Sequence, residues 1–221
     1  MTSHKNIKKP WPTKAAMAQI YEQNLWGGMD TEFYSGAGSH HSETVNPYIA
    51  VVSEFLNGFD SPPTVCDLGC GDFNVGKELV KYCTKYIAVD IVPELISRNK
   101  KEFTAANLEF RAFDIATADL PPGDCAILRQ VLQHLSNAEI HCVAEKLYQF
   151  KYIILTEHLP EGDFEPNKNI ISGQGIRLKK HSGVKLTAPP FNLQVKEERQ
   201  FLSVPAPGFK GVLVTTLYQL R

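Results

Sequence analysis

The middle of the chain alternates between two hydrophobic patterns. Short runs of apolar, often β-branched residues predict strands, and between them apolar residues recur every three or four positions, as in amphipathic helices. The predicted strands are 64–68, 86–90, 108–113, 125–128 and 152–156, and the predicted helices between them are 77–82, 94–104 and 137–150. Such alternation is typical of a parallel sheet covered on both faces. We therefore expect an α/β protein with a three-layer, doubly wound (Rossmann-like) fold.

Different patterns flank this region. Upstream, apolar residues at helical spacing predict two helices, at 15–26 and 44–59. After Pro160, prolines, glycines and a basic run interrupt the pattern, and two strands, 193–202 and 211–220, follow without a long helix between them. Their short connection predicts an antiparallel hairpin at the sheet edge. A chain of 221 residues suits one domain, at 44–221, preceded by an extension at 1–43.

A tight glycine turn follows the first strand of the core, in the sequence VCDLGCGDFNVG. Glycine at positions 69 and 71 lets a ligand approach the backbone across the carboxyl end of that strand. Asp90 ends the next strand, where a carboxylate can accept hydrogen bonds from both hydroxyls of a ribose. This arrangement predicts a cofactor that contains a nucleoside.

Two classes of cofactor use this combination of strand, glycine turn and helix. The dinucleotide pattern has a third glycine three residues after the second, where this chain has Asn74. Asp67, at the strand end, would repel a pyrophosphate but attract the cationic amino-acid part of a sulfonium nucleoside. Asp114 follows the third strand and is placed to accept a hydrogen bond from the adenine amine. The three residues favour the sulfonium nucleoside, and a NAD(P)-dependent oxidoreductase is the alternative.

In this ordered set the sequence resembles the class I S-adenosylmethionine-dependent methyltransferases. VCDLGCGDF resembles the first motif of that family, YIAVDIVPELI the second, FRAFDIA the third, and DCAILRQVLQHLSNAEI its fourth strand and following helix. The resemblance covers residues 64–157. It implies a seven-stranded, mostly parallel sheet whose final strand, 211–220, is antiparallel, with S-adenosylmethionine lying over the strand ends.

The resemblance also implies three groups of cofactor-binding residues. The first group, at the methionine end, is Asp67, Gly69 and Gly71. The second group, at the ribose and adenine, is Asp90, Ile91, Asp114 and Ile115. The third group, below the transferable methyl group, is Arg129 and Gln130. Each acid alone is equally explained as a surface or helix-capping carboxylate, so the ordered set carries the interpretation.

The stretch FYSGAGSH, residues 33–40, precedes the core and lacks the strand, turn and helix of a cofactor cradle. Its two glycines can act as hinges, which predicts a lid over the cofactor. Tyr34, Ser39 and His40 would be its contacts and Trp26 an apolar anchor. The alternative is a surface loop in which the glycines only turn the chain.

The sequence indicates the catalytic residues less clearly than the cofactor-binding residues. Methyl transfer depends mainly on alignment, and a base is needed only where the acceptor must lose a proton. His134 and His158 are the candidate bases, and each is equally explained as a packing and hydrogen-bonding residue. After the fourth strand the chain has RQVL, whereas enzymes that methylate amides or base amines carry Asn/Asp-Pro-Pro-aromatic. We therefore expect a small-molecule acceptor; a non-catalytic protein that binds S-adenosylmethionine is a further alternative.

Composition and charge narrow the function classes. A net charge of −1 argues against a protein whose main ligand is nucleic acid. No apolar run is long enough for a membrane span, and the five cysteines have no metal-binding spacing. We expect a cytoplasmic protein with reduced thiols, no metal and no membrane partner. The basic run RLKKHSGVK, 177–185, steers an anionic acceptor, contacts RNA or forms a solvated turn.

Overall fold

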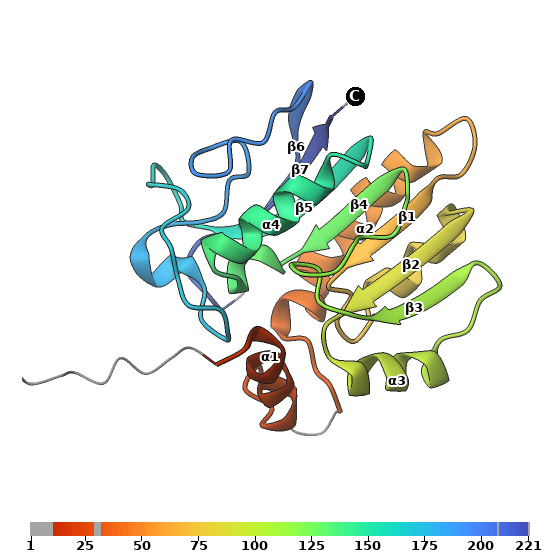
Figure 1. Ribbon diagram of the computed structural model, residues 1–221. Coiled ribbons are helices and arrows are strands. Elements are labelled where there is room, and N and C mark those ends of the chain that lie inside the picture. The colour runs from red at the N-terminus through yellow and green to blue at the C-terminus, as the bar shows by residue number, and fades with distance from the viewer. Residues whose placement is uncertain (1–10, 29–31, 207, 221) are drawn as a thin grey trace, which may run out of the picture.

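The computed structural model describes residues 11–28, 32–206 and 208–220. Seven strands form one sheet in the order β3-β2-β1-β4-β5-β7-β6 (Figure 1). In chain order they are β1 (Thr64–Leu68), β2 (Lys85–Asp90), β3 (Leu108–Ala112), β4 (Cys125–Arg129), β5 (Tyr152–Leu159), β6 (Glu197–Pro205) and β7 (Val212–Gln219). The α-helices are α1 (Thr13–Glu22), α2 (Ser42–Asn57), α3 (Pro93–Glu102) and α4 (Asn137–Leu147).

The pairing of the strands confirms the expected fold class. The first five strands pair in parallel, and β7 is antiparallel to both β5 and β6. The chain runs outward from β1 through β2 to β3 and then returns to place β4 on the other side of β1. Ligands of doubly wound sheets bind at the carboxyl ends of the strands where the order reverses in this way. In Figure 1, α1 lies beside these strand ends.

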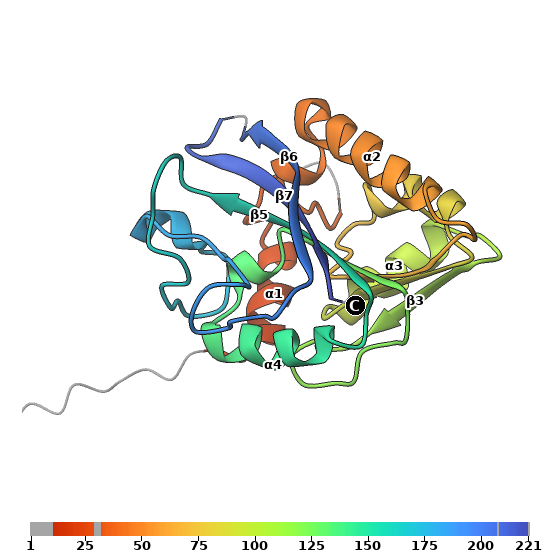
Figure 2. The same ribbon diagram turned by 90° about the horizontal axis from the view of Figure 1, so that it is seen from above.

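Alternation of side chains along the strands produces the three layers. In β2, Tyr86 and Ala88 belong to the buried cluster that contains α2, whereas Ile87 and Val89 belong to the cluster that contains α4. Successive side chains of a strand point to opposite faces of the sheet, so both faces of these apolar strands are buried. Figure 2 shows α2 and α4 on opposite sides of the sheet.

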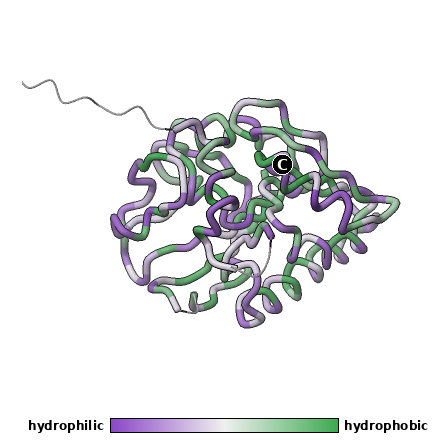
Figure 3. The backbone as a smooth tube through the Cα atoms, turned by 90° about the horizontal axis from the view of Figure 1, so that it is seen from below, coloured by the Kyte–Doolittle hydropathy of each residue, from purple (hydrophilic) through white to green (hydrophobic). Residues whose placement is uncertain are grey.

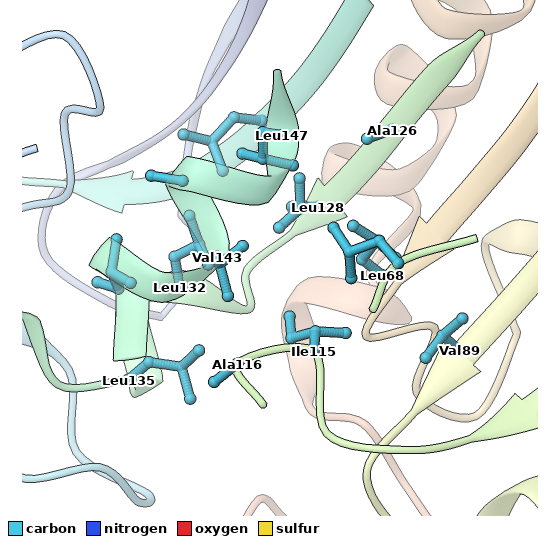
Figure 4. Close-up of a cluster of buried hydrophobic side chains, with 14 of the residues drawn as sticks. Leu68, Val89, Ile115, Ala116, Ala126, Leu128, Leu132, Leu135, Val143 and Leu147 are labelled. Atoms are coloured by element: carbon cyan, nitrogen blue, oxygen red, sulfur yellow. The ribbon is translucent and has the colours of Figure 1, made fainter. Parts of the chain in front are cut away.

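The cluster on the α4 side is built from the centre of the sheet. Leu68 and Leu128 of the strands point toward Val143 and Leu147 of α4, and all four are buried (Figure 4). At the start of α4, Ser136 and Glu139 form a reciprocal capping box that satisfies backbone N–H groups of the first turn. Hydrophobic and hydrophilic positions alternate along the helices in Figure 3, as expected of helices that bury one side.

The predicted helix at 77–82 is wrong. The structure has two short 3₁₀ turns there, Gly76–Glu78 and Val80–Tyr82, closed by hydrogen bonds between residues three apart. Few residues separate the loop after β1 from the start of β2. A 3₁₀ helix rises about 2.0 Å per residue and an α-helix about 1.5 Å, so the tighter helix spans more of the return path along the sheet.

The C-terminal strands also differ from the sequence prediction in their limits. β5 continues to Leu159 because β7 pairs with it along its whole length. β6 begins at Glu197, four residues later than predicted, because Leu193 is buried in the irregular segment before it. That segment, 160–196, covers the α4 side of the sheet and adds Leu186 and Phe191 to its core.

None of the helices in the described part of the chain has the length and apolar character needed to cross a membrane.

A substitution at Leu128 tests the central cluster, because the side chain of this β4 residue is fully buried beneath α4. We expect Leu128→Ala to lower the free energy of unfolding by about 2–5 kcal/mol, since it removes buried methyl groups and leaves a cavity. Urea denaturation measures the change. Ile171→Ala is the control: this side chain is 69% exposed, so its loss should change stability by less than about 0.5 kcal/mol. Equal effects of the two substitutions would contradict this account of the core.

Candidate active site

A cavity of about 670 Å³ lies at the carboxyl ends of the central strands. Most of the residues singled out from the sequence line it: Asp67, Gly69, Gly71, Asp90, Ile91, Asp114, Ile115, Arg129, Gln130, Ser39, His134 and His158. Tyr34 does not; its ring stacks on His40 at 4.4 Å between centroids. The structure thus brings together residues from the ends of five strands and from the segment before α2.

The glycine turn forms the floor of this cavity. Gly69 and Gly71 have φ values of +94° and +55°, a region that side chains rarely adopt. A Cβ atom on Gly69 would lie 2.4 Å from Val131 Cγ2, and one on Gly71 would lie 2.4 Å from Ser35 Oγ. Both glycines are therefore required by backbone conformation and by the close approach of neighbouring segments.

Asp90 is buried at the end of β2 and is held by two backbone groups. Gly71 N–H donates to its Oδ2 at 3.1 Å, and Val92 N–H donates to its Oδ1 at 3.1 Å. Burial raises its pKa to about 6, although hydrogen bonds from the backbone N–H groups of Val92, Gly71 and Ile91 oppose the shift. A carboxylate has about four acceptor sites, so Asp90 can still accept a hydrogen bond from a ribose hydroxyl.

Asp67 is the second buried acid of the cavity. Tyr86 Oη donates to its Oδ2 at 2.9 Å, and burial raises its pKa to about 7. A bound cation beside this carboxylate would favour its charged form and offset the cost of burial. The ammonium group of a methionine moiety supplies such a charge.

Near the ends of β2 and β3 the cavity combines one acid with apolar side chains. Ile91, Phe113 and Ile115 line the cavity there. Asp114 Oδ1 accepts a hydrogen bond of 2.8 Å from Ala116 N–H, which leaves Oδ2 for a ligand donor. Together with the glycine floor, Asp67 and Asp90, these residues fit S-adenosylmethionine.

The segment 35–40 closes over the glycine turn through Asp72. Asp72 Oδ2 accepts from Ser35 N–H at 2.9 Å and lies 2.6 Å from His40 Nε2. Ser35 Oγ in turn accepts from Asp72 N–H at 2.8 Å, and Asn74 Nδ2 donates to the Ser39 carbonyl at 2.8 Å. The segment is therefore bonded to the loop that follows β1.

Arg129 holds the same segment from β4. Its Nη2 donates to the Gly38 carbonyl at 2.6 Å and its Nη1 to Ser39 Oγ at 3.3 Å, while the guanidinium lies 4.9 Å from the centre of the Tyr48 ring. Burial lowers the pKa of Arg129. The resemblance placed this residue beside the methyl group; the structure shows in addition that it binds the segment above.

Helix α1 forms part of the wall. Met17, Ile20 and Tyr21 are buried, and the Tyr21 hydroxyl lies 3.1 Å from Ser35 Oγ. The Trp26 ring contacts the Tyr21 ring edge-on at 5.4 Å and the His134 ring at 5.1 Å, measured between centroids. The N-terminal extension therefore packs against the core and contributes side chains to the cavity.

The two candidate bases have different environments. His134 Nδ1 lies 3.1 Å from the Gly173 carbonyl, so it carries the proton, and Nε2 lies 3.2 Å from Gln133 Nε2, so it accepts. Both nitrogens are thus engaged, and burial lowers the pKa of His134 to about 4. His158 Nε2 donates to the Lys210 carbonyl at 2.8 Å, which leaves the Nδ1 lone pair available. Burial lowers its pKa as well.

Arg177, the first residue of the basic run, is not solvated. It is 1% exposed and donates to the backbone carbonyls of Leu132, Gln133, Leu135 and Lys168 and to Asn137 Oδ1. These bonds hold the loop between β4 and α4, which carries His134, against the segment 160–196. Local sequence does not indicate this role, because a charged residue inside a basic run resembles a surface residue.

Lys179 of the basic run also lines the cavity. Other lining residues were not singled out from the sequence, namely Asp72, Gln133, Gln174, Phe209 and Lys210. Among these, Asp72 had a usable signal, since it follows Gly71 directly in the turn. The others come from loops that reach the cavity only through the tertiary fold.

Residues 65–150 match a family model described as "Methyltransferase domain". Human N-acetylserotonin methyltransferase, solved with SAM, is 19% identical over 95% of this chain, with a TM-score of 0.59. This chain spans 60% of the length of that protein. The N-methyltransferase NodS of Bradyrhizobium japonicum, solved with SAH, is 12% identical, with 93% of this chain and 98% of that chain covered and a TM-score of 0.64. A search of curated proteins finds no match.

The N-terminal domain of EvdMO1, solved in the presence of SAH and D-fucose, is 15% identical, with 96% of this chain and 98% of that chain covered and a TM-score of 0.58. At these identities the solved structures establish the fold. Residues 65–150 match a methyltransferase domain, and proteins with this fold were solved with SAM or SAH, so an S-adenosylmethionine-dependent methyltransferase is the class that the comparisons support. The match favours this class over the NAD(P)-dependent oxidoreductases.

Cofactor affinity should depend on pH through Asp67 and Asp90, whose raised pKa values of about 7 and about 6 leave them partly protonated near neutrality. The charged forms bind the cofactor, so affinity should rise with pH between about 5.5 and 7.5, by up to tenfold per unit for each proton released. Calorimetry with S-adenosylhomocysteine measures the dependence.

Asp67→Asn should weaken binding and flatten the upper part of this pH dependence. Asp119→Asn is the control, because Asp119 is exposed and does not line the cavity. A wild-type affinity that is constant across this pH range would contradict the assignment of these two carboxylates.

Proposed function

We propose that this enzyme methylates a small molecule that binds in the same cavity as the cofactor. The observation that carries the proposal is the extent of the cavity beyond the cofactor-binding residues. Met17, Trp26, Leu178, Phe209 and Leu213 are further lining residues, none of them assigned to the cofactor. A concave, mostly apolar site of this size suits a small ligand. The sequence RQVL after β4, in place of Asn/Asp-Pro-Pro-aromatic, supports the same conclusion.

The bound cofactor supplies a methyl group on a sulfonium centre, which is an excellent leaving group. The protein's contribution is mainly to position the reactants. Asp67 binds the methionine end of the cofactor and Asp90 its ribose, the glycine floor brings it close to the backbone, and the apolar wall excludes water from the acceptor. Ile91, Asp114 and Ile115 hold the adenine, and Gln130 lies with Arg129 at the floor.

We propose His158 as the base where the acceptor must lose a proton. Its Nε2 proton is held by the Lys210 carbonyl, so the free Nδ1 can take the acceptor proton as the new bond to carbon forms. Its lowered pKa keeps the ring neutral at physiological pH. His134 is the weaker candidate because both of its ring nitrogens are engaged.

We propose that the extension 1–43 acts as a lid, with Ser39 among its contacts. The bonds from Asp72, Asn74 and Arg129 to segment 35–40 support this role, and the stacking of Tyr34 on His40 supports a structural role for Tyr34 within the lid. Residues 1–10 and 29–31 of the extension lie outside the described residues.

We also propose a cytoplasmic location. All five cysteines are free, which is the usual state of thiols in a reducing compartment.

The function is tested by incubating the enzyme with methyl-tritiated S-adenosylmethionine and a small-molecule extract prepared by ultrafiltration. We expect label in a product of low molecular mass. Transfer only to protein or RNA in a parallel unfractionated extract would contradict a small acceptor.

In the same assay His158→Gln should lower kcat by roughly 10²- to 10⁴-fold, as expected for loss of a general base, with cofactor affinity unchanged. His134→Gln is the matched control and should reduce kcat much less. An equal loss in the two variants would remove the distinction between the histidines.

The lid is tested by Asn74→Ala, which deletes the hydrogen bond from Nδ2 to the Ser39 carbonyl. One such bond contributes about 0.5–1.5 kcal/mol, so cofactor affinity should fall by roughly 2- to 12-fold. Lys77→Ala is the control, because Lys77 bonds to the same Asn74 side chain but does not contact the lid. Calorimetry that gives identical affinities for the two variants would leave segment 35–40 as a surface loop.

A further inference from the structure

The cavity is divided by charge. Its acidic residues, Asp67, Asp72, Asp90 and Asp114, all lie at or just after the ends of the first three strands, on the cofactor side. Among the described lining residues that follow Asp114 in the chain, none is acidic. The acceptor side instead carries two lysines, Lys179 and Lys210. The two sides therefore suit ligand groups of opposite charge.

The two lysines come from separate parts of the chain. Lys179 belongs to the irregular segment 160–196, and Lys210 belongs to the connection between β6 and β7. No acidic residue occurs in the sequence from 166 to 196. The fold thus brings one lysine from each of two separate segments into the lining of the same cavity.

The other basic residues near Lys179 already have partners. Arg177 donates to backbone carbonyls, Lys180 donates to the Asn169 carbonyl, and Lys168 pairs with Glu165. The ammonium groups of Lys179 and Lys210, by contrast, have no hydrogen bond or ion pair within the described residues. Both are exposed at the cavity and free to bind a ligand.

Apolar side chains lie in the same part of the cavity. Ile176 and Leu178 come from the same segment as Lys179, and Phe209 and Leu213 flank Lys210. An acceptor that fills this space has an apolar body, and its charged group lies at the lysines.

We propose that the methyl acceptor is a small apolar molecule with an anionic group, a carboxylate or a phosphate, that Lys179 and Lys210 bind. The inference rests on the proposed function, because it identifies the acceptor class of the same cavity. Two cations facing one anion in a partly apolar site favour anionic over neutral molecules of the same shape.

The test uses enzyme saturated with S-adenosylhomocysteine, so cofactor binding is measured first and separately. Benzoate, phenyl phosphate and neutral benzyl alcohol are then titrated by calorimetry at low salt. We expect at least one anionic probe to bind about tenfold more tightly than benzyl alcohol, and the preference to shrink as salt is added. The relative affinity of benzoate and phenyl phosphate distinguishes a carboxylate site from a phosphate site.

The double substitution Lys179→Glu and Lys210→Glu should abolish the preference for anions and leave the affinity for S-adenosylhomocysteine unchanged within about twofold. Lys180→Glu is the matched control: it changes the charge of the neighbouring residue, which does not line the cavity, and should keep the preference.

Three results would overturn the proposal: equal or weaker binding of both anions than of benzyl alcohol, no detectable binding of any probe, or an anion preference that survives the double substitution. If the wild-type enzyme does not bind S-adenosylhomocysteine at all, that result instead contradicts the proposed function itself.

Discussion

The carboxylate of Asp90 joins the ends of two neighbouring strands. It accepts one hydrogen bond from the Gly71 N–H after β1 and another from the Val92 N–H after β2. The loop that it holds contains Gly69 and Gly71 at positive φ and also Phe73 at φ +64°, a conformation that a non-glycine residue keeps only where the surrounding bonds maintain it. Asp72, which binds segment 35–40, follows Gly71 in that loop. The proposed ribose acceptor, the floor of the cavity and the anchor of segment 35–40 therefore depend on the same bonds.

The N-terminal extension belongs to the active site although it precedes the sheet in sequence. Tyr21 packs into the core and bonds to Ser35, while Arg129 and Asp72 hold segment 35–40 from two strand ends. Segments that share bonds with a binding site respond to its occupation, because a ligand that fits the closed form stabilises that form. A ligand that fills the cavity would therefore stabilise the extension in the position described here.

The buried charged groups of this protein differ in how fully their hydrogen-bonding capacity is satisfied. The Asp67 carboxylate has one neutral donor, Tyr86, and a raised pKa, so it gains from a cationic ligand. The Arg177 guanidinium is surrounded by carbonyl oxygens and needs no ligand, so it serves to fix loops. The first arrangement is typical of a binding site and the second of a structural one.

The sequence by itself determined the fold class and the cofactor side of the site. Buried parallel strands are continuous apolar runs, so β1 was predicted with the limits observed, and the glycine turn, Asp67 and Asp90 follow strand ends that must meet at one edge of the sheet. The local sequence pattern predicted the wrong element or the wrong limits where pairing with a strand far away in the chain decides the structure. The 3₁₀ turns before β2 reflect the distance between two strands, and the extension of β5 through His158 reflects its pairing with β7.

Only the tertiary structure decided the acceptor side and the roles of similar residues. His134 and His158 look alike in sequence, but the carbonyl or amide that each ring nitrogen meets leaves a free lone pair on His158 alone. Arg177 and Lys179 stand two residues apart in one basic run, yet one is buried against carbonyls and the other lines the cavity. Hydrogen-bond partners and burial come from segments far apart in the chain, and local residue patterns do not encode which of those segments meet.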